Sequence, residues 1–185
     1  RSQGAAGLPW LAKKAGAETP RYTPVIIADR SVGLHVANAV CAALYRREKS
    51  GVGQRVDVPM FESLLQTVLG EHMGGYTYEP PMAPPGYARM LAKERRPYET
   101  KDGYVCVLVC NDKQWQAFFR VIGRPELLQD ARYATQEARS RDFEGAYALV
   151  AEEMAKRSTA EWLAALEAGD IPVQRMNSLE DIVND

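Results

Sequence analysis

Apolar residues recur at helical spacing near the start of the chain. Val32, Val36, Val40 and Leu44 are each four residues apart, and a helix places residues at this spacing on one face. Basic residues and then a glycine follow, which is typical of a helix end. The pattern therefore predicts a helix over residues 31–49 whose apolar stripe faces a core.

The neighbouring segments predict shorter elements. Residues 25–28 are apolar and predict an extended piece before the helix. Residues 55–60 alternate apolar with polar side chains, which predicts a strand, and residues 61–72 carry apolar side chains at helical spacing. Proline, glycine and tyrosine then become frequent, so we interpret residues 76–97 as a linker between two domains.

The second half of the chain opens with a hairpin pattern. Asp102-Gly103 is typical of a tight turn with positive φ angles, and the apolar run 105–110 predicts a buried strand. Asn111 and Gln114 form a capping pattern at the start of a helix. Four residues of this helix fall at core spacing: Trp115, Phe118, Phe119 and Ile122.

Three more elements follow. Residues 136–156 predict one long helix, and the capping box Ser158 to Glu161 begins another that Gly169 ends. Residues 171–173 predict a short edge strand, because its proline cannot donate to a sheet ladder. The fold class is therefore α/β, in two pieces separated by the linker.

Charge and cysteine content exclude several function classes. The chain has 23 basic and 24 acidic residues and a net charge of −1, which disfavours a nucleic-acid partner or an anionic membrane surface. Its apolar runs are too short to cross a bilayer. Cys41, Cys106 and Cys110 lack metal spacing and only two histidines are present, so we expect no metal site. We expect buried, reduced thiols and a cytoplasmic location.

Asp29 is the candidate residue for chemistry. It comes just before the predicted helix 31–49, where the helix dipole stabilises a negative charge by about 0.3–1 kcal/mol. This position is also common for a plain helix cap, and the pattern alone favours the cap. Gly33, in the first turn, leaves room for another group to approach the backbone.

The order of several motifs resembles one enzyme family. In the first half these are Asp29-x-x-x-Gly33, Ala42-Ala43-Leu44-Tyr45-Arg46 and Gly51-Val52-Gly53-Gln54-Arg55-Val56-Asp57-Val58. In the second half they are Arg96-Pro97-Tyr98, Thr100-Lys101-Asp102-Gly103-Tyr104, Trp115 with Phe118, Ile122-Gly123, and Gly169-x-Ile171-Pro172. The chain resembles the class III coenzyme A transferases, the family of formyl-CoA and carnitine CoA-transferases, over essentially its whole length.

The resemblance implies a reaction. Members of the family use one aspartate, here Asp29, as a covalent nucleophile on an acyl-CoA thioester. CoA then moves to a carboxylic acid through an aspartyl intermediate, with no metal. Gly33, Met60 and Arg96 fall where residues would line the coenzyme A site. Arg95 and Arg96, which precede the hairpin, are further candidates to contact a substrate carboxylate or coenzyme A. His35, six residues after Asp29, is not expected to face the same site.

The resemblance also implies an organisation. Residues 1–75 would be the C-terminal part of a Rossmann-like large domain, residues 76–97 the linker, and residues 98–185 a small α+β domain. We expect acyl-CoA and a carboxylic acid as partners, an interlocked homodimer, and a longer polypeptide of which this chain is an internal part. Formyl-CoA transferases carry a run of glycines in the linker, and this chain has none, so other residues would protect the intermediate.

Two alternatives remain open from the sequence. The α-methylacyl-CoA racemases share the fold and place an aspartate at the same helix start, where it works with a histidine as an acid and base pair. That histidine would lie upstream of residue 1. The second alternative is a catalytically inactive fragment that binds a partner chain through its apolar helix faces.

Overall fold

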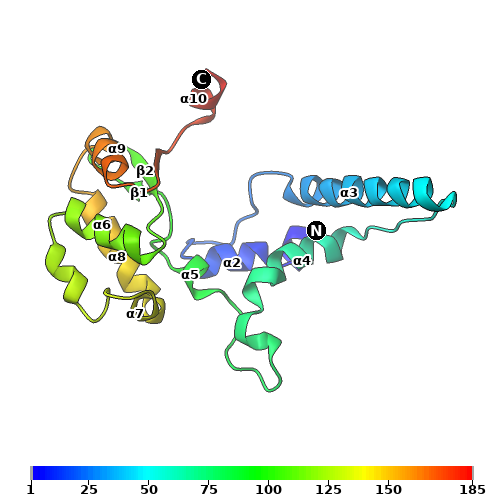
Figure 1. The fold of residues 1–185 in the computed structure, drawn as a ribbon, viewed down its shortest axis with the longest axis horizontal. Helices are drawn as coiled ribbons and strands as arrows, with labels where there is room; N and C mark the ends of the chain where they lie inside the picture. Colours follow the sequence, from blue (N-terminus) through cyan, green and yellow to red (C-terminus); the bar gives the residue numbers. More distant parts are fainter. Residues whose placement is uncertain (1, 185) are drawn as a thin grey trace. The chain divides into compact units, whose positions relative to one another are not determined.

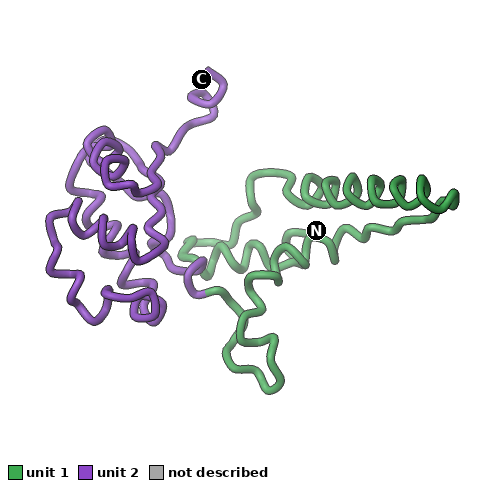
Figure 2. The backbone as a smooth tube through the Cα atoms, in the orientation of Figure 1, with its two compact units in different colours: residues 1–87 green, residues 88–185 purple. Residues whose placement is uncertain are grey.

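The computed structural model describes residues 2–184, which form two compact units, residues 1–87 and residues 88–185 (Figure 2). The division falls inside the range 76–97 predicted as a linker. The two units are described separately below. Together they hold a mostly helical α/β chain with one small sheet, so the coarse fold class is confirmed (Figure 1).

The regular elements in the described part of unit 1 are all helical, and irregular segments connect them. Its elements are α1 (Ser2–Ala5), α2 (Leu8–Lys14), α3 (Ile27–Ser50), α4 (Met60–His72) and the 3₁₀ turn η1 (Gly74–Thr77). Its hydrophobic cluster consists of Ala6, Ala28, Leu64 and Val68, which come from the α1–α2 junction, α3 and α4. This small cluster brings the first turn of α3 against the middle of α4.

Helix α3 begins earlier than predicted. Residues 25–28 were predicted to be extended, but the helix starts at Ile27 and places Asp29 in its first turn. No strand occurs in the described part of unit 1 that could pair with these residues. A helix satisfies its own backbone hydrogen bonds, so it forms where a lone strand has no partner.

The predicted core stripe of α3 is largely wrong. Val32 is 5% exposed, but Val36, Val40 and Leu44 are 42%, 47% and 47% exposed. The spacing does place them on one face of a helix, as expected. Within unit 1, however, α4 packs against the first turns of α3, and the described residues leave the rest of the apolar stripe largely exposed.

The strand predicted over residues 55–60 is also wrong. The chain between Gly51 and Pro59 has no regular hydrogen bonding, and Met60 is the first residue of α4. Alternation describes how a strand is buried, but a strand also needs a neighbour to accept its hydrogen bonds. The structure therefore does not confirm a Rossmann-like sheet in this unit.

Unit 2 combines helices with a three-stranded antiparallel sheet. Its strands, β1 (Tyr98–Glu99), β2 (Tyr104–Val107) and β3 (Val173–Arg175), lie in the order β1-β2-β3. Its helices are α5 (Ala88–Leu91), α6 (Asp112–Val121), the 3₁₀ turn η2 (Pro125–Gln129), α7 (Gln136–Arg141), α8 (Phe143–Met154), α9 (Thr159–Ala168) and α10 (Leu179–Val183). The predicted hairpin is confirmed by the pairing of β1 with β2. An edge strand is present as predicted, but it covers residues 173–175 and not 171–173, because Pro172 has no N–H to donate to the ladder.

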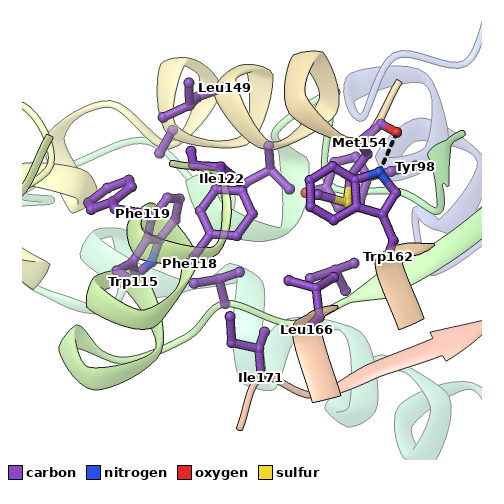
Figure 3. Packing of buried hydrophobic residues seen from close by; sticks show 14 of the residues in the cluster. Tyr98, Trp115, Phe118, Phe119, Ile122, Leu149, Met154, Trp162, Leu166 and Ile171 are labelled. Carbon is purple, nitrogen blue, oxygen red and sulfur yellow. Dashed lines mark hydrogen bonds between the residues drawn. The ribbon is translucent and has the colours of Figure 1, made fainter. Parts of the chain in front are cut away.

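The core of unit 2 is large and aromatic (Figure 3). Trp115, Phe118 and Phe119 of α6 are all buried, as their spacing predicts. Trp162 of α9 packs beside Met154, and its indole N–H donates a hydrogen bond of 2.8 Å to the Met154 carbonyl oxygen. The one polar atom of this side chain is therefore satisfied inside the core.

Side-chain caps begin several helices of unit 2. The predicted capping boxes of Asn111 with Gln114 and Ser158 with Glu161 are confirmed, with both reciprocal hydrogen bonds present in each. The predicted helix 136–156 is two helices, α7 and α8, because Asp142 leaves the helical conformation and accepts a hydrogen bond from the backbone N–H of Gly145. The Asp142 carboxylate thus caps the start of α8, and the backbone at Asp142 does not continue α7.

Two details of the hairpin region differ from prediction. Neither Asp102 nor Gly103 has a positive φ, because the loop spans four residues, 100–103, which do not require a mirror-image turn. Strand β2 is buried on one face only, and Cys106 is exposed. Cys41 is exposed and Cys110 half-buried, so the prediction of buried thiols is wrong, although all three cysteines are free.

Candidate active site at the start of helix α3

Asp29 lies in the first turn of α3 and is exposed. The residue before the helix is Ile26, whose side chain has no hydrogen-bonding atom, so no side-chain cap occupies the helix start. Within residues 2–184 the Asp29 carboxylate forms no ion pair and accepts no hydrogen bond. The carboxylate is thus held at the positive end of a helix and remains available to a ligand.

The adjoining surface of α3 is open. Gly33 follows Asp29 by four residues, so the two lie on the same face of the helix. A Cβ atom built on Gly33 would meet no atom of the described chain within 4 Å. A group approaching the Asp29 carboxylate can therefore pass close to the backbone of α3 at Gly33.

Met60 is the first residue of α4 and is 43% exposed. Leu64, one turn later, is buried in the same cluster as Ala28, the neighbour of Asp29 in the chain. Met60 and Leu64 share a face of α4 because they are four residues apart. Met60 thus lies on the face of α4 that packs toward the start of α3. It lies one helical turn before Leu64, the first residue of α4 in that cluster.

The other two predicted residues do not share a helix face with Asp29. His35 is half-buried on α3 and, six residues after Asp29, lies on a different face of the helix. Arg96 belongs to unit 2, where its guanidinium forms an ion pair of 2.9 Å with Glu94. Asp29, Gly33 and Met60 therefore belong to one unit and Arg96 to the other.

A second candidate site was missed by the sequence reasoning. Arg89, Arg95 and Arg96 line a groove of about 270 Å³ in unit 2, together with Tyr98 and Tyr147. A hydrogen bond to the Tyr147 hydroxyl raises the pKa of Arg89, and burial raises the pKa of Tyr98. Only Arg95 and Arg96 had a sequence signal, because residues 89 and 147 come together through folding.

Residues 2–184 contain no group of three or more His, Cys, Asp or Glu side chains placed to hold a metal ion. Over the same residues, no helix is both long enough and apolar enough to cross a bilayer.

Solved structures share this fold. A crystal structure of Rv3272 from Mycobacterium tuberculosis superposes with a TM-score of 0.73 at 24% identity, covering 96% of this chain and 49% of that one. A CAIB/BAIF family protein from Brucella suis superposes with a TM-score of 0.68 at 25% identity, covering 100% of this chain and 48% of that one.

Described relatives are also similar in sequence over most of this chain. The probable fatty acyl-CoA transferase Rv3272 is 28% identical over 89% of this chain and 44% of its own length. The formyl-CoA:oxalate CoA-transferase of Streptomyces avermitilis is 32% identical over 90% of this chain and 44% of its own length. The chain thus spans less than half the length of these relatives. The model of CoA-transferase family III matches residues 2–185, and the chain therefore belongs to that family.

Proposed function

We propose that the protein to which this chain belongs transfers coenzyme A from an acyl-CoA thioester to a carboxylic acid, with Asp29 as the covalent nucleophile. Family membership over residues 2–185 is the observation that carries the proposal. The relatives named above are CoA-transferases by description. The position of Asp29, exposed at the start of α3 with no partner from the described chain, supports its role.

The proposed reaction proceeds by acyl exchange at the Asp29 carboxylate. A carboxylate oxygen attacks the thioester carbonyl carbon, the carbon–sulfur bond breaks, and CoA leaves as a thiolate beside a mixed anhydride. The thiolate attacks the Asp29 carbonyl carbon of the anhydride and releases the donor acid as a carboxylate. This leaves an aspartyl-CoA thioester, which the acceptor carboxylate attacks to reverse the two steps.

Residues of α3 and α4 would assist this chemistry. The N-terminal end of α3 carries a partial positive charge, which favours negative charge developing near Asp29. Backbone N–H groups are suitable donors for the oxyanions of the tetrahedral intermediates, and one such donor is worth about 3–4 kcal/mol in enzymes that have an oxyanion hole. We propose that the open surface at Gly33 admits the thioester and that Met60 lies beside the thiol end of coenzyme A.

The wider organisation is also a proposal. We assign residues 1–75 of unit 1 to the C-terminal part of a Rossmann-like large domain, residues 76–97 to the linker, and residues 98–185 of unit 2 to a small α+β domain. The exposed stripe of Val36, Val40 and Leu44 supports this assignment, because apolar surface of this kind is normally covered in a complete protein. An interlocked homodimer of the full-length polypeptide is one way to cover it.

The test is a CoA-exchange assay on the full-length polypeptide with a panel of acyl-CoA donors and acids. The Asp29→Asn variant should lower transfer by at least about 1000-fold, as the loss of a covalent nucleophile does in other enzymes. Asp57→Asn is the matched control, because Asp57 is exposed in the irregular segment before α4, and it should leave the rate within twofold.

The same samples separate the transferase from a racemase. A racemase exchanges the α-proton of the acyl group with solvent, so the thioester would gain deuterium in heavy water. The transferase proposal predicts transfer without such exchange. Deuterium incorporation that Asp29→Asn abolishes, in the absence of CoA transfer, would contradict the proposal and favour the isomerase.

A further inference from the structure

The groove in unit 2 has an apolar floor. Val107, at the end of β2, and Val109, just after it, are both buried and line the groove. Tyr98 and Tyr147 are also buried and line the same groove. The groove encloses about 270 Å³. Pockets for drug-sized molecules and cofactors usually enclose about 300–1,000 Å³, so this one suits a smaller ligand with an apolar body.

Positive charge is concentrated at the same groove. Arg89 is held in place, because its Nε donates to the Tyr147 hydroxyl at 2.8 Å and its Nη2 to Cys110 Sγ at 3.1 Å. Arg96 is partly neutralised by Glu94. Arg95 is half-buried, and its guanidinium has no ion pair with any described residue. Three arginines thus line the groove, and of these only Arg96 forms an ion pair with a described carboxylate, so the groove carries a surplus of positive charge.

We propose that this groove binds a small carboxylic acid, with the apolar part of the acid on the valine and tyrosine floor and its carboxylate on Arg95. A guanidinium fork matches a carboxylate with two parallel hydrogen bonds, and such charge-assisted pairs are among the strongest in proteins. The arrangement also explains why a half-buried arginine is kept without a partner from the described chain.

The inference does not depend on the proposed function, because the groove belongs to unit 2 and Asp29 belongs to unit 1. The size of the groove separates the acid from coenzyme A, which is a much larger molecule. Arg96, predicted from the family resemblance to meet coenzyme A, lines this groove as well. We therefore assign Arg96 to the rim of the acid site.

The test is calorimetric titration of the full-length polypeptide with hexanoate, and with hexanol as the probe that lacks a carboxylate. Hexanoate should bind at least tenfold more tightly than hexanol. Arg95→Gln should weaken hexanoate binding by about 10–100-fold, the range expected from the loss of a hydrogen bond to a charged group. Arg95→Lys keeps the positive charge but loses the two parallel hydrogen bonds. Its affinity for hexanoate should therefore lie between the affinities of the unaltered protein and of Arg95→Gln.

Arg120→Gln is the matched control. Arg120 is exposed on α6, does not line the groove and forms no side-chain hydrogen bond with the described residues. This variant should bind hexanoate as the unaltered protein does. Equal binding of hexanoate and hexanol, or an Arg95→Gln variant with unchanged affinity, would overturn the proposal.

A second readout separates this inference from the proposed function. Arg95→Gln should leave modification of Asp29 by acyl-CoA unchanged. Binding of hexanoate that depends on Arg95 in a protein whose Asp29 is never modified would keep the groove and reject the transferase mechanism. Modification of Asp29 with no effect of Arg95 on hexanoate binding would keep the mechanism and reject the groove.

Discussion

At the scale of single residues, Asp102 shows how one carboxylate connects two elements. Its Oδ1 accepts hydrogen bonds from the backbone N–H of Thr159 at 2.7 Å and the hydroxyl of Thr100 at 3.2 Å. Thr159 is the first residue of α9, so the hairpin loop caps a helix that is distant in sequence. The bond from the Thr159 N–H holds the pKa of Asp102 below its ordinary value of 3.8.

This shift predicts a specific acid sensitivity. A carboxyl group whose pKa is lower in the folded state stabilises the fold above its unfolded pKa, and the contribution disappears as pH falls through the folded pKa. Asp102→Asn should therefore lower the free energy of unfolding at pH 7, and the deficit should shrink as pH falls below about 4. Urea unfolding at a series of pH values measures it, and a deficit that stays constant with pH would contradict the account.

At the scale of elements, the sequence predicts best where the structure depends on neighbours in the chain. The capping boxes at Asn111 and Ser158 involve residues three apart, so they are visible without knowledge of the fold. The strand over 55–60 and the buried stripe of α3 depend on partners elsewhere in space. Periodicity correctly identifies α3 as a helix, but it does not show how much of the helix is covered.

The cap of α9 gives a prediction at this scale. Ser158→Ala removes the hydroxyl that accepts from the Glu161 backbone N–H and should lower the free energy of unfolding by about 0.5–2 kcal/mol. Ser140→Ala is the control, since Ser140 is exposed in α7 and its hydroxyl exchanges hydrogen bonds only with Gln136 of the same helix and caps no helix end. Equal loss of stability in both variants, measured by urea unfolding, would argue against the cap.

At the scale of the whole molecule, the two units differ in how much core each contains. Unit 2 buries an aromatic cluster from α6, α8, α9 and the sheet. Unit 1 buries only Ala6, Ala28, Leu64 and Val68 within its cluster, and much of α3 has no tertiary cover from this chain. Most helical stability in proteins comes from tertiary packing, so the two units should differ in local stability.

Hydrogen exchange on the chain of residues 1–185 tests this difference. Backbone amides in α6, α8 and α9 should exchange most slowly, because opening them exposes the large core. Amides in the second half of α3, after Val36, should exchange at least about 100-fold faster, since no tertiary packing opposes their opening. Equal protection of α3 and α6 would contradict this account of unit 1.

The candidate sites were predictable to different degrees. Asp29 stood out through the family motifs, because its local pattern is also that of an ordinary helix start. The groove of unit 2 was not predictable, since folding gathers Arg89, Arg95 and Tyr147 from separate segments. The spacing of residues in the sequence does not show which distant residues come close together in the fold.

The most direct test of the central claim is chemical trapping at Asp29. The full-length polypeptide is incubated with an acyl-CoA, reduced with borohydride and digested with trypsin. Residues 22–30 form one tryptic peptide in which Asp29 is the only carboxylate side chain. Borohydride reduces a thioester to an alcohol and leaves a free carboxylate unchanged, so a lighter peptide reports the aspartyl-CoA intermediate.

We predict that this peptide loses mass only when acyl-CoA is present, and that the corresponding peptide of Asp29→Asn never does. An unmodified peptide, from protein that binds the acyl-CoA and still transfers coenzyme A, would contradict the assignment of Asp29 as the nucleophile.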